Sequence, residues 1–224
     1  MITPERSRVP ETTTEINRFT EEQKFDLREN GYRIYTLTEK SLGALINSGE
    51  KINLQWREGL DRWDQPVAIE FIKSVHSEAA INPKRLFLSK GNNKDLTKQE
   101  EIVNRFSKEL NKKIPGVKAI IGQVPDYAEL YFQHLAKTGE YLFVAKNPKD
   151  FTRTQTLAKY DFKFMATIGL TDGIFTLRKR LTSCGDDDFM SNDVRFAHVA
   201  PLVVPQNTPA LQSWNDFEYW HKIR

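Results

Sequence analysis

Apolar and polar residues alternate most regularly between residues 84 and 145, where three short apolar runs are separated by two longer stretches. The runs at 85–89, 117–122 and 141–145 have the length and composition of buried strands. The stretches between them repeat apolar residues every three or four positions, as amphipathic helices do. Strand, helix, strand, helix, strand at these lengths predicts a parallel sheet with right-handed crossovers.

Capping residues mark the ends of the two helices in this region. Thr97 and Glu100 have the spacing of a capping box, and Pro115-Gly116 closes the helix that it opens. The second helix is expected to begin at Pro125-Asp126 and to end at Gly139, because glycine tolerates the left-handed conformation after a helix.

The flank before this region predicts shorter elements. Residues 1–14 hold two prolines and a threonine run, and we interpret them as a mobile tail. Thr20 and Gln23 form a capping box for a helix that ends at Asn30-Gly31. Further elements are expected in order: a strand at 32–37, a helix capped by Thr38 and ended by Gly49, a strand at 52–56, and a segment at 67–73 that fits a strand better than a helix.

After residue 146 the pattern becomes that of an antiparallel β-structure. Asp172-Gly173 joins two alternating runs, 164–170 and 174–180, as a hairpin turn would. A strand ending at 202–205 follows, and Thr208-Pro209 opens a terminal helix with Leu211, Trp214 and Phe217 on one side. The expected fold class is therefore mixed α/β: a parallel β-α-β-α-β core, an antiparallel β-rich C-terminal extension and a terminal helix.

The expected domain organisation is a tail (1–14) and one globular domain (15–224), made of an α/β part at 15–146 and a β-rich part at 147–224. Hydrophobic residues make up 39% of the chain and charged residues 28%, values typical of folded soluble proteins. No apolar run reaches the roughly 18 residues that span a bilayer. The single cysteine, Cys184, excludes an internal disulfide, so we expect a reducing, cytoplasmic location. No cofactor or metal is predicted.

The candidate site follows from the predicted parallel sheet, whose loops after the strands gather at one edge. Its predicted ligand-binding residues are Ser89, Lys90, Asn92, Asn93, Lys94 and Asp126. Lysines, amides and free N–H groups at a helix start suit a phosphate-bearing or other anionic small ligand. No phosphate-binding or dinucleotide-binding glycine motif is present, so whether the protein is an enzyme is left open. The alternative is a solvated turn, with Asp126 capping its helix.

Other surfaces give alternative hypotheses. The net charge is only +3, but basic side chains concentrate at 84–118 and at Arg153, Lys159, Arg178, Lys179 and Arg180, which would suit weak nucleic-acid binding. The aromatic C-terminal helix would suit a protein partner or self-association. The acidic loop (Asp186, Asp187, Asp188, Asn192 and Asp193) lacks the spacing of a calcium loop, and we interpret it as solvated. His134 is predicted to be a partly buried, hydrogen-bonded histidine.

Overall fold

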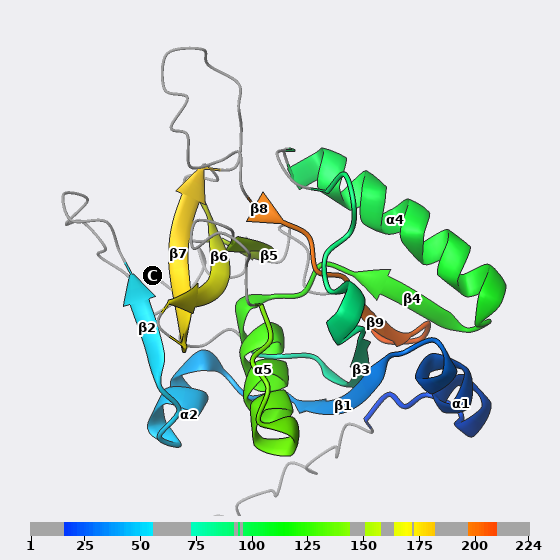
Figure 1. The fold of residues 1–224 in the computed structure, drawn as a ribbon, viewed down its shortest axis with the longest axis horizontal. Helices are drawn as coiled ribbons and strands as arrows, with labels where there is room; N and C mark the ends of the chain where they lie inside the picture. The colour runs from blue at the N-terminus through cyan, green and yellow to red at the C-terminus, as the bar shows by residue number, and fades with distance from the viewer. Residues whose placement is uncertain are drawn as a thin grey trace, which may run out of the picture.

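The computed structural model describes residues 16–55, 73–91, 94, 96–143, 151–157, 164–171, 173–181 and 197–209 (Figure 1). Its helices are α1 (Glu21–Glu29), α2 (Leu42–Asn47), the short 3-10 helix η1 (Pro83–Arg85), α4 (Leu96–Lys113) and α5 (Val124–Thr138). Its strands are β1 (Arg33–Thr38), β2 (Ile52–Gln55), β3 (His76–Ile81), β4 (Val117–Ile120), β5 (Phe151–Leu157), β6 (Phe164–Thr171), β7 (Ile174–Leu181), β8 (Ala197–His198) and β9 (Leu202–Pro205).

The described strands form two sheets, so the mixed helix-and-strand class is confirmed. The first sheet has the order β1-β3-β9-β4, and every neighbouring pair in it is antiparallel. The second has the order β2-β7-β6-β5-β8; its three central strands are antiparallel, and a parallel pair lies at each end. The predicted hairpin is present, with its turn at Gly173 (φ +76°), where a left-handed backbone favours glycine.

The predicted parallel β-α-β-α-β core is wrong. Of its three strands only β4 forms, and β4 pairs antiparallel with β9 from the far end of the chain. Arg85 ends η1, and residues 86–89 follow it as irregular backbone. Phe143 has a φ of 60°, which a strand does not allow, and residues 144–145 lie outside the described part. Leu142 and Phe143 are nevertheless 2% and 1% exposed, so the apolar run signalled burial rather than strand geometry.

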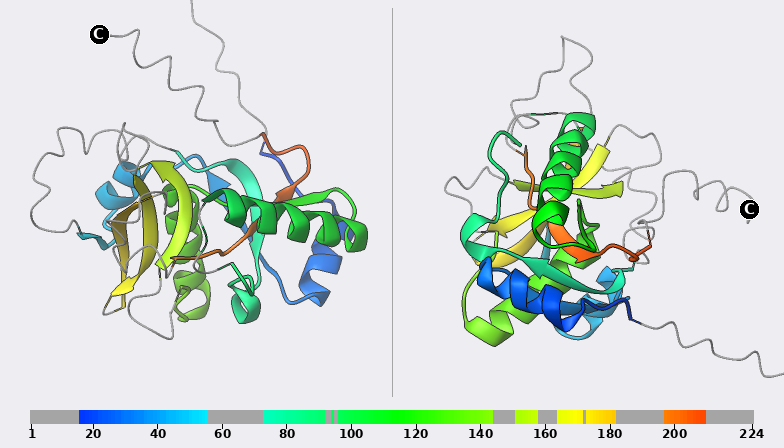
Figure 2. Two further views of the ribbon diagram at one scale, coloured as in Figure 1. Left: turned by 90° about the horizontal axis from the view of Figure 1, so that it is seen from above. Right: turned by 90° about the vertical axis from the view of Figure 1, so that its right-hand side faces the viewer.

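Helix α5 lies between the two sheets, and α1 and α4 cover the opposite face of the first sheet (Figures 1 and 2). Strand alternation explains this layering, because successive side chains of β9 point to opposite faces. Leu202 and Val204 join α5 and the second sheet in the largest core cluster, whereas Val203 packs with Leu110 of α4 and Leu27 of α1.

Several predicted helix ends are confirmed. Thr20 caps α1 through the expected box with Gln23, and Gly139 ends α5 in the left-handed region with a φ of 70°. Two caps differ. The N-cap of α2 is Ser41 rather than Thr38, and α4 begins before the predicted cap Thr97. The tail, most of segment 67–73, the acidic loop and the residues beyond 209 where a terminal helix was predicted lie outside the described residues, and the domain division stays a prediction.

Candidate functional site

One polar stripe of α5 runs along the outer edge of β1, which is the first strand of its sheet. Glu129 accepts from the Thr38 N–H at 3.2 and 3.1 Å and from the Thr38 hydroxyl at 2.7 Å. Gln133 Nε2 donates to the Thr36 carbonyl at 2.7 Å. Four helical residues rise about 6 Å, nearly the advance of two strand residues, so helix and strand stay in step.

The next position of the same stripe is Lys137, and there the hydrogen bonding to the strand ends. The Lys137 ammonium lies over the Tyr35 ring, 5.0 Å from its centroid, as a cation–π contact. Among the described residues, Lys137 makes no hydrogen bond to the β1 backbone. The helix therefore covers the edge of β1 at Thr38 and Thr36 and leaves it at Ile34.

The backbone of Ile34 points to this uncovered edge. In an antiparallel pair, alternate residues direct both N–H and C=O to the same side. Thr36 and Thr38 direct theirs away from β3, since their partners on β3, Glu78 and His76, bond instead to Asn17. Ile34 is two residues before Thr36 and has the same orientation.

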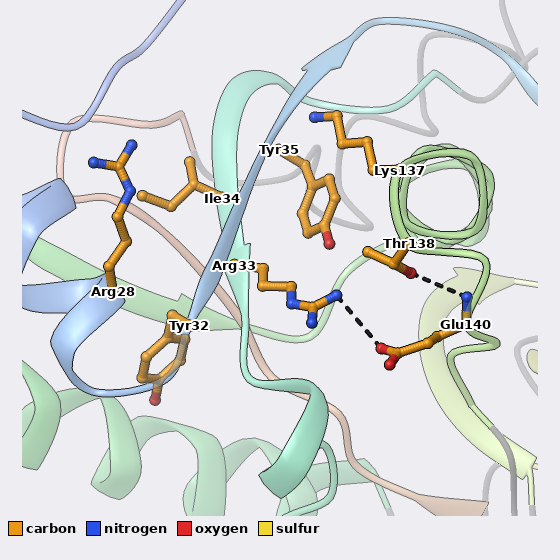
Figure 3. A pocket seen from close by; sticks show the side chains of 8 residues that line it. All are labelled: Arg28, Tyr32, Arg33, Ile34, Tyr35, Lys137, Thr138 and Glu140. Carbon is orange, nitrogen blue, oxygen red and sulfur yellow. Dashed lines mark hydrogen bonds and ion pairs between the residues drawn. The ribbon is translucent and has the colours of Figure 1, made fainter.

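A pocket of about 540 Å³ surrounds this uncovered edge (Figure 3). It is lined by Arg28, Tyr32, Arg33, Ile34, Tyr35, Lys137, Thr138 and Glu140. The lining residues divide between the two faces of β1: Arg28, Tyr32 and Ile34 lie on the α1 side, and the others on the α5 side (Figure 3). The lining holds three cations, Arg28, Arg33 and Lys137, and a single carboxylate, so the electrostatic potential of the pocket favours anions.

The single carboxylate, Glu140, is held at the rim by two contacts. Arg33 Nη1 lies 3.5 Å from Glu140 Oε2, and the side chains are 45% and 65% exposed. The Glu140 N–H donates to Thr138 Oγ1 at 3.1 Å. An exposed ion pair of this length contributes little stability, so an incoming anion can replace Glu140 on Arg33 at small cost.

His134 lies behind the pocket and is fully buried. Its Nδ1 is 2.5 Å from the Tyr35 hydroxyl, and its Nε2 is 3.9 Å from Glu140 Oε2. Burial, and then Arg33, lower the pKa of His134, while burial raises the pKa of Tyr35. The neutral imidazole therefore accepts from the Tyr35 hydroxyl and directs its Nε2 hydrogen towards Glu140, without a hydrogen-bond partner among the described residues. The predicted hydrogen bond of His134 is confirmed, but the side chain is fully rather than partly buried.

Asp126 joins the start of α5 to the segment before β3. It is 0% exposed, and its two oxygens accept from the Val75 and Gln123 N–H groups at 2.7 Å each. Burial raises its pKa to about 7, and the two backbone hydrogen bonds oppose this shift. Asp126 therefore caps its own helix, as the alternative interpretation of the sequence held.

The described residues among those predicted for the anion site (Ser89, Lys90, Lys94 and Asp126) do not line this pocket. Ser89 and Lys90 are exposed on the turn before α4, where Lys90 has a φ of 69°, and Lys94 is also exposed. Asn92 and Asn93 lie outside the described residues. Asp126 is in the core, whereas the other described members are on the surface. Binding at this turn stays a prediction.

The charged lining of the pocket was missed because its members come from unrelated segments. A signal was nonetheless present in α5: Glu129, Gln133 and Lys137 form a polar stripe, four residues apart, on a helix whose first half is buried. Such a stripe marks a helix face that contacts water or polar groups rather than apolar side chains.

The basic block at 84–118 lies mostly on η1 and α4. Lys84, Arg85, Arg105, Lys108 and Lys112 are exposed there, whereas Lys118 donates from Nζ to the Thr208 carbonyl. Side chains of the second basic block, including Arg153 and Arg178, lie outside the described part. Nucleic-acid binding through the two blocks therefore stays a prediction.

Comparison with known proteins gives no relative: the chain matches no protein-family profile, no curated protein and no solved structure. None of the described helices is long and apolar enough to cross a membrane. No group of three or more metal-ligating side chains occurs among the described residues.

Proposed function

We propose that this protein binds a phosphate-bearing or other anionic ligand in the pocket at the uncovered edge of β1. The observation that carries the proposal is the placing of Arg28 on one side of the Ile34 backbone and of Arg33 and Lys137 on the other. The Ile34 N–H adds a directed donor between them. A backbone N–H with flanking guanidinium and ammonium groups is a donor set that carboxylates and phosphates accept well.

Arg33 is the main recognition residue in this proposal. Its planar guanidinium can donate two parallel hydrogen bonds to a carboxylate or phosphate, which Lys137 cannot do. The anion takes the place of the Glu140 carboxylate. Tyr35 keeps Lys137 beside the pocket through the cation–π contact, and His134 fixes the Tyr35 hydroxyl from behind.

Isothermal titration calorimetry at low salt tests this proposal with inorganic phosphate, adenosine monophosphate and succinate. We expect saturable binding of at least one of them, weakened roughly tenfold or more by Arg33→Gln, since charged hydrogen bonds are lost. Arg105→Gln, an exposed arginine on α4, is the matched control and should bind as the wild type does. Absence of saturable binding, or equal weakening in both variants, would overturn the proposal.

A further inference from the structure

The pocket is also the open end of a β-sheet. β1 is an edge strand, and Ile34, Thr36 and Thr38, with Tyr32 just before the strand, point backbone groups outward by the alternation of the strand. Three of these residues already have a partner: the Tyr32 N–H donates to the Leu27 carbonyl, and α5 side chains bond Thr36 and Thr38. Ile34 alone of the four has both outward groups without a described partner.

We infer that an extended acidic peptide segment adds as a strand to β1 at Ile34. This inference rests on the proposed anion pocket and identifies the anion as a carboxylate side chain of a peptide. A strand added there accepts the Ile34 N–H and donates to the Ile34 carbonyl, and it extends the four-stranded sheet by one strand. Proteins commonly cover such edges, and here α5 bonds the edge at Thr36 and Thr38 but not at Ile34.

The two faces of the pocket specify the side chains of the peptide. Successive residues of an added strand alternate between the faces. On the α5 face they meet Arg33 and Lys137, which favour glutamate or aspartate. On the α1 face they meet the half-buried Tyr32 and Ile34, which favour aliphatic residues beside the single cation Arg28. The preferred peptide therefore alternates acidic and β-branched residues.

A second copy of this chain is a weaker occupant of the same edge. Pairing two β1 strands would bring Arg33 and Lys137 of one copy against the same residues of the other. Like charges placed opposite each other on paired strands destabilise the pair. Complementary charge in a different, acidic segment avoids this repulsion.

The test uses a capped hexapeptide that alternates valine and glutamate, with two singly N-methylated forms. One form carries the methyl group on the third residue and the other on the fourth, so they differ only in which edge of the peptide loses a donor. We expect the parent peptide to bind in fluorescence anisotropy, one methylated form to bind roughly tenfold more weakly, and the other to bind nearly as the parent does. A slip of the register by two residues keeps each methyl group on the same edge of the peptide.

Two protein variants and one further peptide complete the design. Arg33→Gln should weaken binding of the parent peptide, Arg105→Gln should not, and a valine–lysine peptide should not compete. Equal affinity of the two methylated forms would overturn strand addition and leave anion binding intact. Binding of phosphate or succinate without binding of the peptide would likewise overturn strand addition and leave anion binding intact. If none of the probes binds, both the anion site and strand addition are overturned.

Size-exclusion chromatography of the protein alone tests whether a second copy of the chain occupies the edge of β1. A concentration-dependent dimer that the valine–glutamate peptide fails to dissociate, and that blocks peptide binding, would assign the edge to a second copy and overturn the inference. A monomer, or a dimer that coexists with bound peptide, supports it.

Discussion

Gln133 donates from its side-chain amide to the carbonyl of Thr36 at 2.7 Å, and so a helix takes the place that a neighbouring strand would hold. The contact joins residues 97 positions apart and is partly shielded from water. Edge strands expose a row of unpaired backbone groups, and a side-chain amide can satisfy them without adding a strand. The same helix leaves Ile34 uncovered four helical residues later, where Lys137 turns to the Tyr35 ring.

Replacing Gln133 should show how much this edge contact contributes. Gln133→Leu keeps the size of the side chain but leaves the Thr36 carbonyl without its donor. We expect the free energy of unfolding to fall by about 1–2 kcal/mol, the usual effect of losing one partner of a partly buried hydrogen bond. Urea denaturation followed by circular dichroism measures it. Lys137→Gln, further along the same stripe, should change stability by about 0.5 kcal/mol or less; equal losses in both would contradict the contact.

Gly122 is predicted to tolerate no side chain. A Cβ there would lie 2.5 Å from Leu202 Cδ1 and 3.2 Å from both Asp126 Oδ2 and Tyr127 Cε2. We expect Gly122→Ala to destabilise the protein by about 1–3 kcal/mol through overpacking. The comparison is Gly139→Ala, where nothing lies within 4 Å but φ is +70°, so only backbone strain of about 1 kcal/mol is expected. A smaller effect at Gly122 than at Gly139, measured by thermal unfolding, would show that the side chain of Leu202 on β9 moves aside at little cost.

Asp126 should make stability depend on pH. Its folded-state pKa of about 7 lies above the ordinary 3.8, because burial favours the neutral form. Between these values the folded protein binds more protons than the unfolded chain, so the contribution of Asp126 to stability falls as pH rises from about 4 to about 7. Asp126→Asn should remove much of that fall, even though it also weakens one backbone hydrogen bond.

The measurement is the free energy of unfolding in urea at about pH 5 and about pH 8, compared between the wild type and the variant. Glu101→Gln, at an exposed position of α4, is the control and should keep the pH profile of the wild type. Parallel profiles for wild type and Asp126→Asn would show that the backbone hydrogen bonds from Val75 and Gln123 hold the carboxylate ionised throughout.

Glu140 should compete with any anion for Arg33. We expect Glu140→Gln to raise the affinity for phosphate or succinate severalfold, because the guanidinium is released and the pocket loses its negative charge. The change in stability should be about 0.5 kcal/mol or less, since the Arg33–Glu140 pair is largely exposed. Titration calorimetry at two salt concentrations measures the effect, which should shrink with salt. Unchanged or weaker anion binding would place the anion away from Arg33.

Local signals predicted several elements correctly. Thr20 and Gln23 fixed the start of α1, Gly139 fixed the end of α5, and Asp172-Gly173 marked the hairpin of β6 and β7. Each of these signals acts within a few residues, so its physical cause is present in the sequence itself. The capping role of Asp126 is of the same kind.

The partner of β4, in contrast, could not be predicted locally. Val117–Ile120 pairs with Leu202–Pro205, and no short-range pattern connects segments more than eighty residues apart. The run at 141–145 misled for a related reason, since Leu142 and Phe143 are buried without forming a strand. Apolar residues report burial, and burial between α5 and the second sheet looks the same in sequence as burial in a parallel strand.

What the sequence determined alone, then, is the existence of α1, α2, α4 and α5, the hairpin turn and the apolar faces, because propensity, capping and periodicity are local. The order of the strands, their antiparallel pairing and the pocket at Ile34 were decided by tertiary structure. Arg28, Arg33 and Lys137 belong to α1, β1 and α5, and their spacing in the sequence does not indicate a shared pocket. The packing of α5 along β1 decides both points. About four residues of helix advance as far as two residues of strand, so α5 bonds the strand at Thr38 and Thr36 and not at Ile34. The same packing places the charges of Arg28, Arg33 and Lys137 around the Ile34 backbone.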